Sequence, residues 1–442
     1  MFANDEDTIF APASGAGRAA IAVVRLSGPG CEGALQAIAP GAAFPDRRAT
    51  LRTLRHPQSG EPLDRALITR FQAPRSFTGE AMAEISVTGG RAVVSGLVKA
   101  LLLVPGLRLA EPGEFAWRAF MKGKIDLSEV EGLADLVEAE TEAQRRQAER
   151  VAGGALGREC EAIRASLLDA MAAVETQIDF SDIEDAADFT LQSVRSAAGA
   201  ALERIDGALA TADSAQRLRE GFTIVIAGAP NVGKSTLMNA LAGRDVAITS
   251  PIPGTTRDLI EVFLDLRGYP VILVDTAGIR ESADPIEQEG VARARRRAGS
   301  ADLTLWLNDG GDGEAPDMGS PTLTVRTKID LAETRACGPD PDGLAISAKT
   351  GEGIDRLLDV LADLAEERMS SDEPALLTLE RHRRAFQDAR QALGSALDVS
   401  AAEPELIAED LRRAASAMDR VVGRIGVEDV LGEIFARLCV GK

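Results

Sequence analysis

Short apolar runs of the kind that form β-strands occur along the first 120 positions of the chain. They are "AAIAVVRLS", "ALITRF" and "AEISVTGG". A stretch near 91–104 has helical spacing instead, and glycine and proline residues mark the joins. This mixture predicts an α+β domain over residues 1–120.

The pattern becomes helical near residue 121. "DLSEVEGLADLVEAETEAQRRQAERV" and "IRASLLDAMAAVETQIDF" repeat apolar residues every three or four positions, with charged residues between them. After "SSDEP" at 370–374 the helical pattern returns and continues to the last residue. We therefore predict one helical bundle built from two parts, residues 121–217 and 370–442.

Strands and helices alternate in the intervening residues 218–369. The strands "FTIVIA", "YPVILVDT", "LTLWLND" and "TLTVRTK" are separated by helical stretches or glycine turns. This order predicts a mainly parallel α/β sheet. The predicted fold class is therefore multidomain: an α+β domain, then a helical bundle that is interrupted by an inserted α/β domain.

Composition and charge restrict the function classes. The chain has 442 residues, of which 27% are charged, and a formal net charge of −20. Such an acidic balance argues against a generic polyanion-binding surface, so any nucleic-acid contact should be local. The clearest basic run is Arg293, Arg295, Arg296 and Arg297, which we interpret as a solvated helix face.

Cysteine and histidine usage argues against a zinc site. Cys31, Cys160, Cys337 and Cys439 are far apart, and His56 and His382 are the two histidines. This usage fits a reducing cytoplasm. The N-terminus lacks a signal-peptide layout, and no apolar run approaches the ~20 residues that span a bilayer.

The strongest motif is "GAPNVGKS" at 228–235, which follows an apolar strand and precedes a helix. It matches G-x-x-x-x-G-K-S, the loop whose backbone N–H groups surround phosphate oxygens. We expect Lys234 to reach the β- and γ-phosphates and the Ser235 hydroxyl to bind Mg²⁺.

Further nucleotide motifs follow in the expected order. "GTTRD" at 254–258 supplies Thr256 as a second Mg²⁺ ligand, and "DTAG" at 275–278 resembles a γ-phosphate sensor. The predicted nucleotide-binding residues are Asn231, Val232, Gly233, Lys234, Ser235, Thr236, Ser250, Thr255, Thr256, Asp275, Thr276, Ala277, Gly278, Lys328, Asp330, Ser347, Ala348 and Lys349.

"TKID" at 327–330 and "SAK" at 347–349 favour GTP over ATP. The Asp330 carboxylate can accept hydrogen bonds from guanine N1–H and N2–H₂, and the stem of Lys328 can lie along the base. GTPases usually have asparagine at the position of Thr327. We expect this change to weaken guanine affinity, while Asp330 retains the discrimination.

Ile279 occupies the position where many such enzymes have a water-orienting glutamine. Charge on the transferred phosphoryl group must then be balanced by an arginine or by a monovalent cation. Asn231 and carbonyls of the 250–255 loop can hold K⁺. A general base can come from Glu281, Glu287 or Glu289, and the residue types alone do not choose among them.

Several segments together resemble the bacterial tRNA-modification GTPases of the MnmE (TrmE) family. They are "DTIFAPASGAGRAAIAVVRLSG", "SFTGE", "AEPGEFAWRAFMKGKIDL", "GAPNVGKST", "GTTRD", "DTAGIRE" and the terminal "CVGK". The resemblance covers essentially the whole chain. "SFTGEA" departs from the commoner pattern, because Ala81 stands where a carboxylate is usual.

The resemblance implies a K⁺-dependent GTPase domain. It implies Asn231, Ser250, Ile252 and Thr255 as K⁺ ligands, and Glu287 as the catalytic glutamate. It also implies a site for 5,10-methylene- or 5-formyl-tetrahydrofolate. The matching folate positions are Arg25, Glu80, Lys124 and Lys442, and Cys439 is a candidate for a chemical role nearby.

The resemblance also implies partners. The family forms a homodimer through the N-terminal domain and works with the FAD-containing MnmG. Together they install an aminomethyl- or carboxymethylaminomethyl-type group on C5 of the wobble uridine of certain tRNAs. A ribosome-assembly-type GTPase and a membrane transport GTPase are the rival hypotheses. The acidic charge and "CVGK" count against the first, and the missing apolar span against the second.

Overall fold

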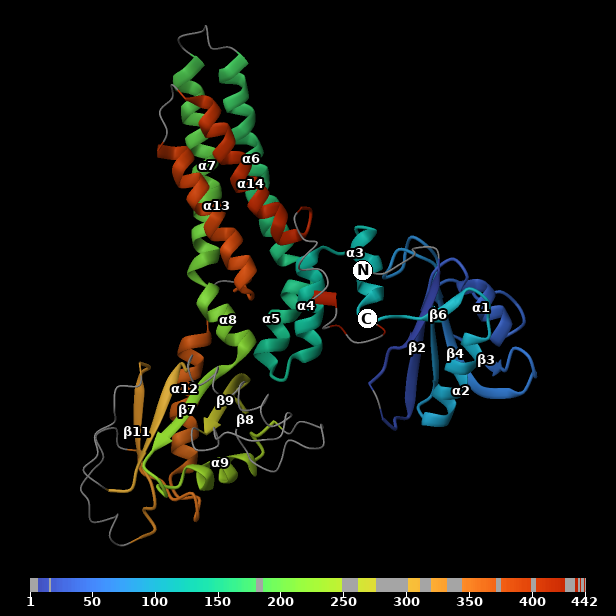
Figure 1. Cartoon of the computed structure of the whole chain (residues 1–442), viewed down its shortest axis with the longest axis horizontal. Coiled ribbons are helices and arrows are strands. Elements are labelled where there is room, and N and C mark those ends of the chain that lie inside the picture. Colours follow the sequence, from blue (N-terminus) through green and yellow to red (C-terminus); the bar gives the residue numbers. More distant parts are fainter. Residues whose placement is uncertain are drawn as a thin grey trace, which may run out of the picture. The chain divides into compact units, whose positions relative to one another are not determined.

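The computed structural model describes residues 7–15, 17–179, 186–248, 261–275, 301–310, 319–331, 344–370, 375–398, 403–425, 434–435, 438 and 441. These residues form two compact units (Figure 1). The first comprises Met1–Ala134, Val151–Ala187 and Ala401–Lys442, and the second comprises Asp135–Arg150 and Asp188–Ser400. The predicted domain boundaries at 120, 217 and 369 stay predictions.

A six-stranded sheet forms most of the first 110 residues, in the order β3-β4-β5-β2-β1-β6. Neighbouring strands are antiparallel except for β1 and β6. The strands are β1 Thr8–Pro12, β2 Ile21–Ser27, β3 Thr50–Arg55, β4 Pro62–Phe71, β5 Met82–Thr88 and β6 Leu107–Leu109. This arrangement confirms the predicted α+β character of the segment.

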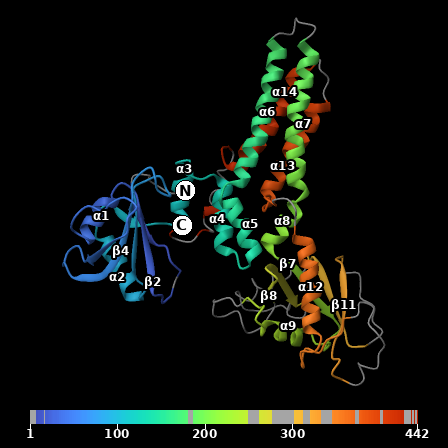
Figure 2. The same ribbon diagram turned by 180° about the vertical axis from the view of Figure 1, so that it is seen from behind.

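Two helices, α1 Cys31–Ile38 and α2 Arg91–Leu102, contribute to the core on one face of this sheet (Figure 2). The opposite face is covered over β1, where Ile9 and Ala11 pack against Phe115 of helix α3 Glu114–Met121. It is open over β3 and β4, because cross-strand neighbours Leu51 and Leu67 are 52% and 46% exposed.

Helices make up much of the remaining chain. They are α4 Leu127–Glu138, α5 Glu142–Ala152, α6 Ala155–Asp179, α7 Ala186–Ala210, α8 Ala212–Glu220, α13 Glu380–Asp398 and α14 Pro404–Val422. In the first unit α6 and α14 are joined by an ion pair of 3.1 Å between Arg164 and Asp419. In the second, Arg390 of α13 lies 2.6 Å from Asp206 of α7.

The helical stretch predicted across 126–151 is interrupted. Residues 139–141 separate α4 from α5, because Thr141 and Gln144 form a capping box. The Thr141 hydroxyl accepts the Gln144 N–H at 3.4 Å, and the Gln144 side-chain oxygen accepts the Thr141 N–H at 3.2 Å. The sequence contains this T-x-x-Q signal, which the apolar periodicity obscures.

A five-stranded sheet forms the α/β part, in the order β11-β10-β7-β9-β8. Its strands are β7 Phe222–Gly228, β8 Glu261–Leu266, β9 Tyr269–Asp275, β10 Leu303–Asn308 and β11 Thr322–Arg326. All pairs are parallel except β8 with β9, which confirms the predicted mainly parallel sheet. Helices α9 Lys234–Ala242 and α12 Ile354–Met369 contribute to its core.

None of the helices that the structure describes is long and apolar enough to span a bilayer.

Candidate functional site

The phosphate loop joins β7 to α9 and needs an unusual backbone. Gly228, Asn231 and Gly233 have φ angles of 146°, 62° and 109°. A side chain at Gly228 is excluded, because its Cβ would lie 2.5 Å from the carbonyl oxygen of Leu307 on β10. The loop therefore turns tightly against the neighbouring strand, so the backbone enters α9 at the position predicted for the phosphates.

Lys234 and Ser235 begin helix α9. The Lys234 ammonium group donates to the carbonyl oxygens of Gly228 and Ala229, both at 2.9 Å. The Ser235 hydroxyl donates to the Asp275 carboxylate at 3.2 Å, and Asp275 is 3% exposed at the end of β9. Two adjacent oxygen ligands fit Mg²⁺, which prefers carboxylate and hydroxyl oxygens.

Thr327 links the loop predicted for the base to the phosphate loop. Its hydroxyl donates to the carbonyl oxygen of Val232 at 2.7 Å, and its backbone N–H donates to Asn308 at 2.7 Å. The residue is 4% exposed. Threonine in place of asparagine therefore still connects the loop predicted for the base to the phosphate loop. It also uses the only proton that a hydroxyl can donate.

The two predicted base motifs lie together. The Ser347 hydroxyl donates to Asp330 at 2.8 Å and accepts the Thr350 N–H at 3.2 Å. Ser347 is fully buried, so this contact fixes the Asp330 carboxylate. Lys328 has a φ of 58° and pairs with Asp309 at 2.9 Å. Ala348 is partly buried and Lys349 is exposed.

A second candidate site lies on the six-stranded sheet around Arg25 of β2. Its guanidinium group donates to Glu84 of β5 at 2.9 and 3.2 Å, and to the Gly441 carbonyl oxygen at 3.1 Å. The rings of Phe77 and Phe115 lie 5.7 and 5.9 Å from its Cζ atom. Arg25 thus lies where the covered part of the sheet face meets the open part.

Gly441 explains part of the terminal "CVGK" motif. Its φ is 107°, and a Cβ there would lie 2.5 Å from the carbonyl oxygen of Pro12. Only glycine permits this close approach of the C-terminal backbone to the end of β1. The motif therefore brings a backbone carbonyl group to Arg25.

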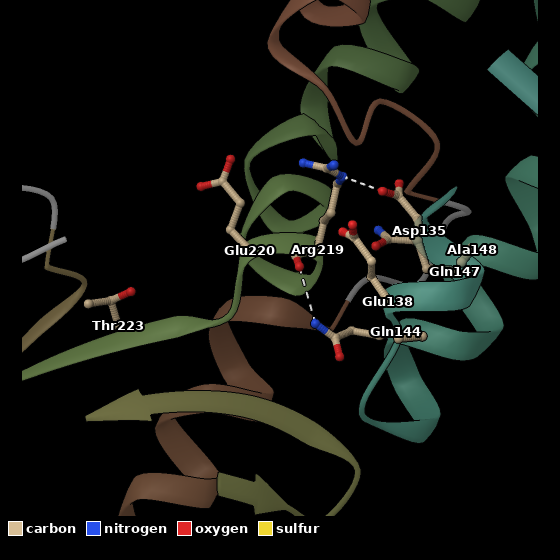
Figure 3. A pocket seen from close by; sticks show the side chains of 9 residues that line it. Asp135, Glu138, Gln144, Gln147, Ala148, Arg219, Glu220 and Thr223 are labelled. Atoms are coloured by element: carbon tan, nitrogen blue, oxygen red, sulfur yellow. Dashed lines mark hydrogen bonds and ion pairs between the residues drawn. The ribbon is translucent and has the colours of Figure 1, made fainter. Parts of the chain in front are cut away.

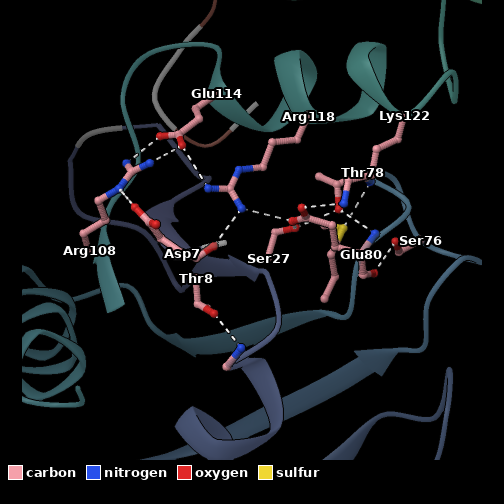
Figure 4. A network of polar contacts seen from close by, with 12 residues as sticks. Asp7, Thr8, Ser27, Ser76, Thr78, Glu80, Arg108, Glu114, Arg118 and Lys122 are labelled. Atoms are coloured by element: carbon pink, nitrogen blue, oxygen red, sulfur yellow. Dashed lines mark hydrogen bonds and ion pairs between the residues drawn. The ribbon is translucent and has the colours of Figure 1, made fainter. Parts of the chain in front are cut away.

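Glu80, the predicted folate carboxylate, is 6% exposed and already paired (Figure 4). It accepts hydrogen bonds from Ser27 at 2.7 Å and from Arg118 at 3.2 Å. The Lys122 ammonium group lies 3.0 Å away as an ion pair outside hydrogen-bond geometry. Glu84 is instead the carboxylate that contacts Arg25, and its side chain is 33% exposed.

Sequence reasoning missed Glu84. Arg25 and Glu84 are direct cross-strand neighbours in the β2–β5 register, so a prediction of this strand pairing would have placed Glu84 beside Arg25. Lys124, a third predicted folate residue, donates to the Pro74 carbonyl oxygen at 3.0 Å.

Arg118 is the centre of an ionic network in the first unit (Figure 4). Its side chain is 1% exposed, and it contacts Glu80, Glu114 at 3.1 Å and the Asp7 carbonyl oxygen at 2.9 Å. Burial opposes ionisation of Glu114, but Arg108 and the Glu111 N–H outweigh it and lower the pKa of that carboxyl. The carboxyl group of Glu114 is therefore ionised at neutral pH.

A polar pocket of about 350 Å³ lies apart from the predicted site residues (Figure 3). Arg219 of α8 pairs there with Asp135 at 2.8 Å, and Gln144 donates to the Arg219 carbonyl oxygen at 3.1 Å. These contacts join the end of α4 and the start of α5 to α8, which leads into β7. We assign the pocket a structural role.

Several predicted residues lie outside the described part of the chain. They are Ser250, Ile252, Thr255, Thr256, Thr276, Ala277, Gly278, Glu287, Cys439 and Lys442. Their assigned roles stay predictions, as does the interpretation of the basic run at 293–297.

Comparisons with known proteins agree with this arrangement. A family model described as GTP-binding protein TrmE N-terminus matches residues 8–124, and one described as MnmE helical domain matches 127–439. A Methylobacterium sp. (strain 4-46) protein named tRNA modification GTPase MnmE is 52% identical over 99% of this chain and 100% of its own length. A Beijerinckia indica protein of that name is 51% identical over 99% and 96%.

Among solved structures, the FeoB G-domain from Methanococcus jannaschii is 28% identical over 33% of this chain and 98% of its own, with a TM-score of 0.24. The family assignment rests on the full-length relatives, because about half of the aligned residues are identical over almost the whole of this chain. The chain belongs to the MnmE (TrmE) family of tRNA modification GTPases.

Proposed function

We propose that this chain is a K⁺-dependent GTPase that modifies C5 of the wobble uridine of certain tRNAs. It works with an FAD-containing partner of the MnmG type and adds an aminomethyl- or carboxymethylaminomethyl-type group from a tetrahydrofolate one-carbon donor. The observation that carries the proposal is the presence of two separate candidate sites in one chain. One holds Ser235 beside Asp275 for phosphate chemistry, and the other holds Arg25 beside Glu84.

Residues of α9 and β9 prepare the phosphate chemistry. Lys234 exchanges its two carbonyl partners for β- and γ-phosphate oxygens when the nucleotide binds. Ser235 and Asp275 would hold Mg²⁺, with Thr256 as the predicted further ligand. When bound, Mg²⁺ supplies positive charge next to the phosphate oxygens. The chain's own contribution is the fixed geometry of these oxygens.

Asn231 supports the K⁺ part of the proposal. Its left-handed backbone lies within the phosphate loop, two positions before Gly233. Its side-chain oxygen, with carbonyls at Ser250, Ile252 and Thr255, would hold a monovalent cation beside the nucleotide. This assignment also explains why Ile279 is tolerated, because the positive charge comes from the cation and not from a side chain.

We expect GTP turnover to fall about tenfold when Na⁺ replaces K⁺ at equal ionic strength, because the loop would no longer present a well-fitted positive charge to the transition state. Phosphate release at saturating GTP measures this. Asn231→Ala should lose the preference for K⁺, and equal turnover of the wild-type chain in both salts would contradict the cation site.

Glu287 is the proposed general base, acting through an intervening water. Glu287→Ala is expected to slow hydrolysis about 100-fold and to leave the Kd for GTP within about twofold, because general-base catalysis contributes to the chemical step alone. Single-turnover hydrolysis and nucleotide titration separate the two quantities. Glu281→Ala and Glu289→Ala are the matched controls, and a normal rate in Glu287→Ala would move the role to one of them.

The Arg25 site is the proposed folate site. A carboxylate suits the donor edge of a pterin, and Arg25, which donates to Glu84 at 2.9 Å, would orient that carboxylate, while lysines suit the carboxylates of a glutamate tail. Lys124 and Lys442 are the other proposed cations. The accessible carboxylate beside Arg25 is Glu84, whereas Glu80 is buried and paired. We therefore propose Glu84 as the pterin-binding carboxylate and give Glu80 the role of holding the 76–80 loop.

Glu84→Gln is expected to weaken 5-formyl-tetrahydrofolate binding about tenfold, because a charge-assisted hydrogen bond is lost. Glu80→Gln is the matched control, which should lower stability more than affinity. Calorimetric titration and thermal melting of both full-length variants test this. The opposite outcome, with affinity lost in Glu80→Gln alone, would support the sequence-based assignment of Glu80.

The open sheet face supports a homodimer through the N-terminal domain. Ile21, Leu51 and Leu67 share one face of the sheet, because Leu51 pairs with Leu67 and the register continues through Ser86 to β2. Their exposure of 63%, 52% and 46% leaves an apolar surface that a second copy would cover. This face is continuous with the Arg25 site.

The cellular test is nucleoside analysis of tRNA from cells that lack this gene. We place the activity in the cytoplasm, where tRNA is modified. Loss of the wobble-uridine side chain, restored by the wild-type gene, is the expected result. A ribosome-assembly GTPase would instead leave the tRNA nucleosides unchanged and alter ribosomal particles.

A further inference from the structure

Exposed arginines gather at the outer border of the six-stranded sheet. Residues 46–75 contain seven arginines but only Asp46, Glu61 and Asp64 as acidic residues, in a chain with a net charge of −20. Six of these arginines lie on or beside β3 and β4, and β3 is the last strand of the sheet. One of the six, Arg70, pairs with Glu32 at 2.8 Å, and the other five have no such partner among the described residues. We call this group the arginine edge: Arg47, Arg48, Arg52, Arg55 and Arg65.

The arginine edge is not neutralised by the protein. Within the described residues, no carboxylate lies within 4.0 Å of any of its five guanidinium groups. Several exposed arginines elsewhere do have such partners. Arg145 pairs with Glu142 at 2.8 Å, Arg412 with Glu409 at 3.1 Å and Arg413 with Asp410 at 2.9 Å. The arginine edge therefore keeps its positive charge unpaired within the described residues, in a chain whose net charge is −20.

Two members of the arginine edge are held in position by neutral groups. Arg52 lies over the ring of Phe44 at 5.5 Å and donates to the Ala42 carbonyl oxygen at 3.1 Å. Arg47 lies over the ring of Phe71 at 5.9 Å. Such contacts orient the guanidinium plane and leave its charge intact. The Arg52 Nε–H is buried without a hydrogen-bond partner among the described residues.

We infer that the arginine edge binds the phosphate backbone of the tRNA, an inference that rests on the proposed function. Strand β3 has six residues, which at about 3.3 Å each span ~20 Å, enough to face several phosphates of one strand. Oriented guanidinium forks match phosphate oxygens and also stack on unpaired bases. An acidic chain is thereby able to contact RNA locally.

The competing explanation is protection of a sheet edge. Charged residues on an outer strand prevent pairing with another chain. That role needs charge but predicts no affinity for RNA. The two explanations therefore differ in what happens to tRNA binding when the charges are removed.

The test uses the full chain and an unmodified transcript of a tRNA with uridine at the wobble position. The edge variant carries Arg48→Gln, Arg55→Gln and Arg65→Gln, three exposed residues without aromatic contacts in the structure. The control variant carries Arg145→Gln, Arg412→Gln and Arg413→Gln, which removes the same number of charges from paired positions. Fluorescence anisotropy gives Kd at several salt concentrations.

We expect the edge variant to bind tRNA at least about tenfold more weakly than the control variant at about 100 mM salt, with a salt slope smaller by about two. The corresponding lysine variant, R48K/R55K/R65K, should retain most of the affinity, since it keeps the charge. Equal Kd values for the edge and control variants, or a wild-type chain that does not bind tRNA at low salt, would overturn the inference.

Complementation of a gene deletion in cells distinguishes this inference from the proposed function. If deletion of the gene removes the wobble side chain and the edge variant restores it as fully as the control variant, the arginine edge has no role and the proposed function stands. If deletion leaves the nucleoside unchanged, the proposed function itself fails. Aggregation of the edge variant with unchanged tRNA affinity would assign the arginines to edge protection.

Discussion

Asp330→Asn is expected to weaken GTP binding by about 10³-fold or more and to create a site for xanthosine triphosphate. The Asp330 carboxylate, fixed by Ser347 at 2.8 Å, offers acceptors for guanine N1–H and N2–H₂. An amide replaces one acceptor with a donor, so it faces the guanine amino group with a donor of its own. A donor facing a donor at the base discriminates strongly between nucleotides. Xanthine has a carbonyl group at that position and accepts the new donor.

Nucleotide titration with GTP and xanthosine triphosphate measures the exchange, and hydrolysis of the second nucleotide shows that the site remains intact. A matched analogue is 7-deaza-GTP, which lacks the N7 acceptor. It should bind the wild-type chain within about twofold of GTP, because the Thr327 hydroxyl donates its one proton to Val232 and has none for N7. A variant that loses affinity for both triphosphates equally would indicate misfolding instead of altered recognition.

Arg118→Met is expected to destabilise the N-terminal sheet by about 3 kcal/mol, because it removes the buried cation that Glu80 and Glu114 share. Each carboxylate keeps only its more exposed cationic partner, Lys122 or Arg108. Glu80 and Glu114 are 6% and 1% exposed and both contact Arg118. A methionine of similar length fills the space, so most of the loss is electrostatic.

Hydrogen–deuterium exchange of the β1 and β2 amides in the full chain measures this local free energy of opening. Arg145→Met is the control, and little change is expected there because Arg145 pairs at the surface. The triple variant Arg118→Met, Glu80→Gln, Glu114→Gln should recover part of the lost protection. Protection no higher in the triple variant than in Arg118→Met would show that uncompensated charge is not the cause.

The strands and the phosphate site were accessible to prediction because their signals are local. The β-type run "AAIAVVRLS" predicted β2, and the strand–glycine–helix order around Gly233 predicted the phosphate loop. The interruption between α4 and α5 was missed, because apolar periodicity continues across the capping box at Thr141. A cap competes with periodicity over a single turn, so a window of many residues averages it out.

The candidate folate site shows the limit of local patterns. Glu80 and Glu84 are four positions apart, and both stand next to glycine or apolar residues in the sequence. Their environments differ because a helix and a loop cover one and leave the other at the boundary of an open sheet face. The sequence around Glu80 and Glu84 does not indicate how much of the sheet face the helix and the loop cover.

The order of the motifs in this sequence determined the family, the nucleotide and the sequence of strands and helices, since each depends on residues that are close in the chain. Tertiary structure decided which carboxylate meets Arg25, brought the Gly441 carbonyl group across 416 positions, and left the arginine edge without acidic partners. The physical reason is that burial and pairing depend on distances between segments, which the packing of the sheet and its covering helix sets.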